Sequence, residues 1–211
     1  MIVYLYREEA KGLLANLAHS SIDLLEEKLM FLLDLLKEDD WTFVIKAHAL
    51  IETAVTQMLV EHLGEVELMK IVELLPLSEN RTGKIAVARQ LKLLDDKQRR
   101  FVRFFSELRN SLVHRLDNLN FTFENYVSTL DSNQRRSLKE SVAWFADDEQ
   151  MRKEWEMIAE DNPRVGVYIA IHCLMAHCIL STQQSSALRE IDEMAIRTTK
   201  ELLDVAGRVD T

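Results

Sequence analysis

Glycine and proline are scarce in this sequence, with five and two residues among 211. Sheets, sandwiches and barrels need turn residues roughly every 8–12 positions, so the scarcity argues against an all-β fold. Apolar residues make up 47% and charged residues 29%, which excludes a disordered chain. We therefore expect one all-α domain over residues 1–211, built as an antiparallel helical bundle.

The chain has only two cysteines, Cys173 and Cys178, which excludes a disulfide framework and favours a reducing cytoplasm. The apolar run at residues 1–6 is too short for a signal peptide. The longest apolar run, residues 165–180, contains two histidines and is shorter than the ~20 residues of a membrane span. We expect a cytoplasmic protein without a membrane segment.

Helical periodicity and cap signals divide the chain into segments. Ser20 or Ser21 is the expected N-cap of the first helix, and Ser20 with Asp23 has the spacing of a capping box. Asn162 followed by Pro163 is typical of a helix start. The last helical segment, 163–206, is either one long helix or a pair of helices separated by a break in the polar stretch 181–186. The expected helices cover about residues 22–36, 41–63 with Gly64 after the end, 65–75, 85–94, 97–115, 124–130, 132–146, 149–160 and 163–206. Residues 117–161 are a candidate insertion between bundle helices.

The charge is unevenly distributed. The net charge of −9 argues against a protein that coats nucleic acid over its whole surface. Between Arg81 and Arg115, however, ten basic residues face three acidic ones, so this segment carries +7 and the remainder −16. The segment indicates a local anionic ligand, or basic residues that offset acidic helices of the same fold.

The helix inside this segment has one apolar arc and one polar arc. At about 100° per residue, Arg103, Glu107, Asn110 and His114 lie within about 60° of each other, opposite the phenylalanines and leucines. Arg109 falls at the edge of the apolar arc, where an arginine needs a partner. A guanidinium, an amide and an imidazole on adjacent turns can bind phosphate and transfer protons, whereas a salt-bridged arginine is the plain structural interpretation.

The sequence Arg109-Asn110-Ser-Leu-Val-His114 resembles the R-N-x-x-x-H form of the motif of HEPN domains, and the mannitol-operon-repressor-like proteins carry a related pattern. His48-Ala-Leu-Ile-Glu52 is similar to the Glu-containing helix that often precedes the motif. The resemblance covers about residues 20–116, with the motif on the helix 97–115. It implies a dimeric helical bundle, and in many family members a metal-independent endoribonuclease of toxin–antitoxin, phage-defence or RNA-processing systems.

Under this resemblance Arg109 and His114 are catalytic, Asn110 orients them, and no cofactor or metal is needed. The basic residues expected to bind RNA are Lys97, Arg99, Arg100 and Arg103. The expected partners are a second copy of the chain, RNA as substrate, and an antitoxin or another protein. Two other interpretations stay open: a non-catalytic HEPN-type module that binds a protein or a nucleotide, and a mannitol-repressor-like regulator.

Two other histidine groups have plain explanations. The segment His172-Cys173-Leu-Met-Ala-His177-Cys178 lacks the second Cys/His cluster of a zinc site, so we expect core residues there. For His48 and Glu52, one turn apart, we expect hydrogen bonds within their own helix.

Overall fold

The computed structural model describes residues 11–12, 15, 26, 30–114 and 116–209, and within these it is all-α, without a strand. Residues 30–35 are helical, whereas the capping box expected at Ser20, Ser21 and Asp23 lies outside the described residues. The later elements are α2 (Asp40–Leu63), η1 (Val66–Leu68), α3 (Met69–Leu74), α4 (Lys84–Gln90), α5 (Asp96–Val113), η2 (Leu116–Asn120), α6 (Phe123–Thr129), α7 (Ser132–Val142), η3 (Ala143–Phe145), α8 (Glu149–Asp161) and α9 (Pro163–Val209).

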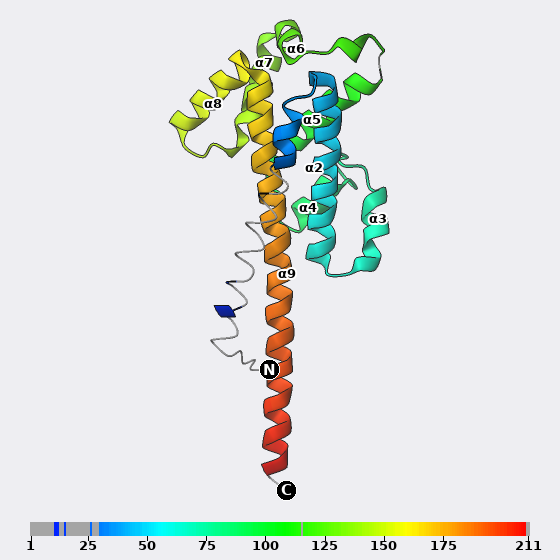
Figure 1. Cartoon of the computed structure of the whole chain (residues 1–211), viewed down its shortest axis with the longest axis vertical. Helices are drawn as coiled ribbons and strands as arrows, with labels where there is room; N and C mark the ends of the chain where they lie inside the picture. Colours follow the sequence, from blue (N-terminus) through cyan, green and yellow to red (C-terminus); the bar gives the residue numbers. More distant parts are fainter. Residues whose placement is uncertain (1–10, 13–14, 16–25, 27–29, 115, 210–211) are drawn as a thin grey trace.

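The two longest helices form the scaffold. α9 runs the length of the molecule, and α2 packs along its N-terminal half through the most extensive contact in the fold (Figure 1). α5 packs against α2, while α6, α7 and α8 gather around the start of α9 (Figure 1). The shared core includes the fully buried side chains of Phe43, Ile51, Phe101, Phe105 and Ile171.

Local cap signals explain where the main helices begin and end. Asp39 accepts a hydrogen bond from the Thr42 backbone N–H at the start of α2, and Gly64 ends that helix in the left-handed region at φ 76°. Asp131 and Asp148 cap α7 and α8 in the same way. The starts of α2, α7 and α8 and the end of α2 lie within about one residue of the expected limits, although Asp131 caps α7 where Ser132 is the cap that the sequence suggests.

Other expected features differ from the structure. α7 ends at Val142 rather than near Ala146, and the short helix η3 follows it. α4 ends at Gln90 rather than near Leu94, and Lys92 has a positive φ of 59°. α9 continues through residues 181–186, where the Thr182 and Ser185 hydroxyls donate to carbonyls one turn earlier and so do not disturb the helix.

Residues 117–161 pack into the same core as the rest of the bundle. Leu138, Val142 and Trp144 are buried, and the Trp144 ring lies 6.4 Å from that of Phe101 on α5. Gly166 allows α9 to approach closely, since a Cβ there would lie 3.1 Å from the Ala159 Cα and the Val142 side chain.

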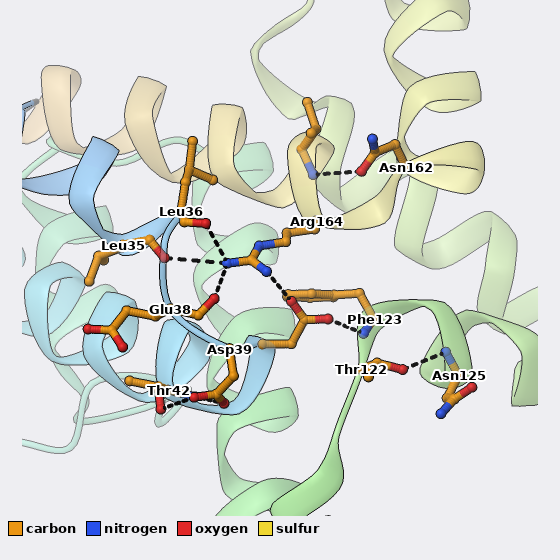
Figure 2. A network of polar contacts seen from close by, with 12 residues as sticks. Leu35, Leu36, Glu38, Asp39, Thr42, Thr122, Phe123, Asn125, Asn162 and Arg164 are labelled. Atoms are coloured by element: carbon orange, nitrogen blue, oxygen red, sulfur yellow. Dashed lines mark hydrogen bonds and ion pairs between the residues drawn. The ribbon is translucent and has the colours of Figure 1, made fainter.

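Arg164, in the first turn of α9, joins four segments (Figure 2). Its guanidinium donates to the carbonyl oxygens of Leu36 and Glu38 and lies 2.9 Å from the Asp40 carboxylate. The other oxygen of Asp40 accepts the Phe123 backbone N–H at 2.8 Å, at the start of α6. One arginine and one aspartate thus fix the end of the helix at 30–35 and the starts of α2, α6 and α9.

Two helices, Asp40–Leu63 and Pro163–Asp204, are long and apolar enough to cross a membrane by length and composition alone. Their most apolar windows are 61% and 50% buried within the bundle. Core helices of soluble proteins pass the same test, so this finding is weak evidence for a membrane segment.

Candidate functional site

α5 presents the predicted motif on a helix whose start and inner face are firmly fixed. Asp95 and Gln98 form a reciprocal capping box, with Asp95 accepting the Gln98 backbone N–H at 2.8 Å. Phe101, Phe105 and Leu112 are buried in the core, as the apolar arc predicts. The polar arc therefore faces outward.

The first two motif residues contact each other. The Arg109 Nη1 donates to the Asn110 Oδ1 at 3.1 Å. Arg109 is half-buried, and its Nε is enclosed without a hydrogen-bond partner among the described residues. Asn110 is exposed. Arg109 has no ion pair with any described residue, so the salt-bridged interpretation of this arginine does not hold for that part of the chain.

His114 lies at the end of α5. It is the C-cap residue, with helical backbone angles of φ −92° and ψ −1°, and its side chain is exposed. Because residues three and four apart on a helix are neighbours, its imidazole is close to the Asn110 amide. The three motif residues thus occupy the last turn and a half of α5, two of them exposed and one set into the surface.

A buried polar cluster lies under the motif helix. The His48 Nε2 on α2 is 3.2 Å from the Ser106 hydroxyl on α5, and the His48 and Phe105 rings stack at 6.5 Å. Burial lowers the pKa of His48, and the positive charges of Arg109 and Lys84 lower it further while Glu52 opposes them. Arg109 is therefore close enough to His48 to influence its protonation.

Glu52, one turn beyond His48, binds a lysine from α4. The buried Lys84 Nζ lies 2.7 Å from the Glu52 Oε1, and Lys84 exposes only 2% of its surface. Gly83 permits this placement, since a Cβ there would collide with the backbone of Glu79 and Pro76. The expected hydrogen bonds within the α2 helix are thus wrong: His48 bonds to α5 and Glu52 to α4.

The four residues predicted to bind RNA lie along α5, and three of them pair with carboxylates. Lys97 is 3.4 Å from Asp147, Arg100 is 3.2 Å from Glu140, and Arg99 pairs with Asp96. Arg103 has no ion pair with a described residue. The basic residues of this helix thus offset acidic neighbours in the described part of the chain, whereas Arg103 and Arg109 form no ion pair there.

The histidines and cysteines of α9 make contacts that do not involve the motif residues of α5. His177 lies 2.7 Å from the Leu93 carbonyl oxygen, and the His172 ring is tilted at 57° to that of Tyr168, 6.0 Å away. Cys178 is buried, which raises its pKa to about 12. Among the described residues, no group of three or more His, Cys, Asp or Glu side chains is arranged to hold a metal ion.

Comparisons with protein-family models, with curated proteins and with solved structures found no match to this chain. The site is therefore defined by its own geometry. The motif residues could be found from the sequence because they are close in the chain. Ser106 and Lys84 could not, since nothing local shows that they meet His48 and Glu52.

Proposed function

We propose that this protein is an endoribonuclease of the HEPN type that cleaves RNA phosphodiesters at Arg109, Asn110 and His114. The observation that carries the proposal is the Arg109–Asn110 hydrogen bond beside an exposed His114, with Arg109 held in no ion pair by the described residues. An arginine anchored by an amide, rather than neutralised by a carboxylate, keeps its charge for a phosphate.

The residue types suit transesterification by the RNA itself. The 2′-hydroxyl attacks the adjacent phosphorus, and His114 accepts its proton, as an imidazole can near neutral pH. Arg109 stabilises the negative charge that develops on the phosphorane oxygens. The bond to the 5′-oxygen then breaks, and that oxygen takes up a proton. The products are a 2′,3′-cyclic phosphate and a 5′-hydroxyl, and the resemblance implies that no metal is needed.

The basic side chains of α5 support strand binding. The ion pairs of Lys97 and Arg100 are solvent-exposed, and such pairs contribute little to stability, so a phosphate can replace the carboxylate at small cost. Arg103 lies on the same arc as Asn110 and His114. We expect this row of side chains to bind the backbone on one side of the cut.

The test is cleavage of total RNA by the purified protein in EDTA, with sequencing of the fragment ends. We expect discrete fragments that carry 2′,3′-cyclic phosphates, and at least a 100-fold loss of rate for His114→Ala. His62→Ala is the matched control, because His62 is also exposed but lies at the end of α2. Its rate should equal that of the unmodified protein.

Absence of cleavage, or equal cleavage by His114→Ala, would contradict the proposal. If RNA is bound but not cut, the non-catalytic binding module takes precedence. The same preparation tests for a protein partner, such as an antitoxin, by its ability to block the cleavage.

A further inference from the structure

A cavity of about 260 Å³ lies beside the motif, between the end of α5 and the segment formed by η2 and α6. Its wall on α5 includes Ser111, which directly follows Asn110. The other walls come from residues 118–129, a stretch that contains three asparagines.

The lining of this cavity combines aromatic rings with amides. Phe121 and Tyr126 are half-buried, and their ring centroids lie 6.0 Å apart at 51°. Three asparagines also line it: Asn118, Asn120 and Asn125. Aromatic faces that are partly exposed provide stacking surfaces for bases, and amides offer a donor and an acceptor side by side.

The three asparagine side chains differ in their hydrogen bonding. The Asn118 Nδ2 donates to the Ser111 carbonyl at 2.7 Å, which fixes this amide against α5. The side-chain amides of Asn120 and Asn125 are exposed and form no hydrogen bond with the described residues. One amide is thus positioned in advance, while two retain their hydrogen-bonding capacity for a ligand.

Part of the motif lies on the side of α5 that forms the cavity wall, whereas Arg109 lies about 160° around the helix from Ser111. Ser111 and His114 are three residues apart, which places them about 60° from each other around the helix and on neighbouring turns. His114 does not itself line the cavity, but it is on the neighbouring turn beside Ser111, and Asn110 directly precedes Ser111. In RNA the base and the phosphate of one nucleotide are separated by a single ribose, a spacing that suits this arrangement.

We infer that the cavity binds one unpaired nucleobase of the RNA, that of the nucleotide whose 2′-hydroxyl attacks, and that it prefers adenine. Stacking on Phe121 and Tyr126 holds the ring, and the asparagine amides bond its edge, since an amide pairs with adenine N6 and N7 in a two-point contact. The position of the cut relative to this base rests on the proposed function, whereas base binding does not.

Binding is measured on His114→Ala with short single-stranded RNA made uncleavable by 2′-deoxy or 2′-fluoro sugars. We expect an oligonucleotide with one adenine in a uridine background to bind more tightly than oligouridine. The double variant Asn120→Ala/Asn125→Ala should lose this preference, with a rise of about tenfold in the Kd for the adenine strand. Ser128→Ala is the control, because Ser128 is exposed on α6 outside the cavity.

Cleavage-end sequencing is the second arm. With the two asparagines intact, fragments should end in adenosine 2′,3′-cyclic phosphate, and Asn120→Ala/Asn125→Ala should lose this preference through slower cleavage after adenosine. Cleavage without a base preference, or a preference that survives the double variant, would overturn the inference and leave the nuclease proposal standing. Adenine-selective binding without cleavage would instead support the cavity and overturn the nuclease.

Discussion

The Arg109 side chain is half-buried, and this position restricts the orientation in which its guanidinium can bind a phosphate. The Asn110 amide holds Nη1 of the planar guanidinium and Nε is enclosed, so a phosphate would be bound through Nη2 and the second N–H of Nη1. We expect Arg109→Lys to lower kcat/KM by about 100-fold, because an ammonium has no planar fork. Asn110→Ala should cost about tenfold.

The measurement is initial cleavage rate on one RNA, with thermal unfolding of each variant. Arg197→Lys, an exposed arginine on α9, is the control and should change neither. Stability should stay within about 1 kcal/mol for Arg109→Lys and Asn110→Ala. If both variants unfold far more easily than the unmodified protein, the two residues have a structural role and the catalytic assignment is wrong.

His48 predicts a pH dependence of stability. Burial and the nearby charges of Arg109 and Lys84 lower its pKa below the ordinary 6.5. Below that pH the unfolded chain binds a proton that the folded chain resists, so this residue stabilises the fold above about pH 6.5 and the contribution is lost as the pH falls. Burial lowers the pKa of His172 in the same direction.

We therefore expect the Tm to fall between pH 7 and pH 5, and to fall less for His48→Gln, whose amide can still bond Ser106 but does not titrate. Thermal unfolding at half-unit steps of pH measures this. His62→Gln is the control for loss of an exposed histidine. Identical pH profiles for His48→Gln and the unmodified protein would show that His48 titrates alike in both states.

At the scale of elements, helices with local signals at both ends could be predicted and those fixed by distant contacts could not. α2 and α5 carry their caps in the sequence, at Asp39, Gly64 and Asp95. α4 ends early without a glycine or proline; there the Leu93 carbonyl oxygen meets His177 of α9 instead. The site divides in the same way: the motif is local, but the contacts of His48 and Lys84 depend on how the helices pack.

Arg164 joins several helices, and its contacts contribute to the free energy of unfolding. Its side chain is 28% exposed, the Asp40 side chain is 13% exposed, and the guanidinium also lies 5.6 Å above the Phe43 ring. Removing it leaves one oxygen of the Asp40 carboxylate and the carbonyls of Leu36 and Glu38 without the guanidinium, while the other Asp40 oxygen keeps the Phe123 N–H. We expect Arg164→Ala to destabilise the protein by about 2–4 kcal/mol.

Thermal and urea unfolding test this prediction, with an expected fall in Tm of roughly 5–15 °C for a chain of this size. Arg197→Ala on the same helix is exposed and should shift the Tm by no more than about 1–2 °C. Equal stability of the two variants would mean that the four segments are held by the core alone.

At the scale of the whole molecule, the opposing charges of its parts bear on assembly. The segment from Arg81 to Arg115 carries +7 and the rest of the chain −16. Within the fold, Asp147 and Glu140 already lie against Lys97 and Arg100. Two copies can therefore approach near α5 without strong repulsion, provided that such carboxylates, or the phosphates of an RNA, lie between the basic strips.

The chemistry gives a reason for that approach. A single chain offers one motif arginine and one motif histidine, whereas displacement at phosphorus gains from a base on one side and an acid on the other. His114 is exposed at the end of α5, where a two-fold axis would place its symmetry copy across a shared cleft. We expect a symmetric dimer by light scattering at micromolar concentration, with both His114 side chains serving one RNA strand.

Mixing two inactive variants tests the shared cleft. In a mixture of Arg109→Ala and His114→Ala, some dimers combine an intact arginine from one chain with an intact histidine from the other. Such a mixture should regain part of the activity that each variant lacks alone, provided the subunits are allowed to exchange. His114→Ala mixed with Asp204→Ala, an exposed position far along α9, controls for dilution by a fully active chain. A monomer that retains full ribonuclease activity, or a mixture of the two motif variants that remains inactive after proven exchange, would mean that each chain completes its own site.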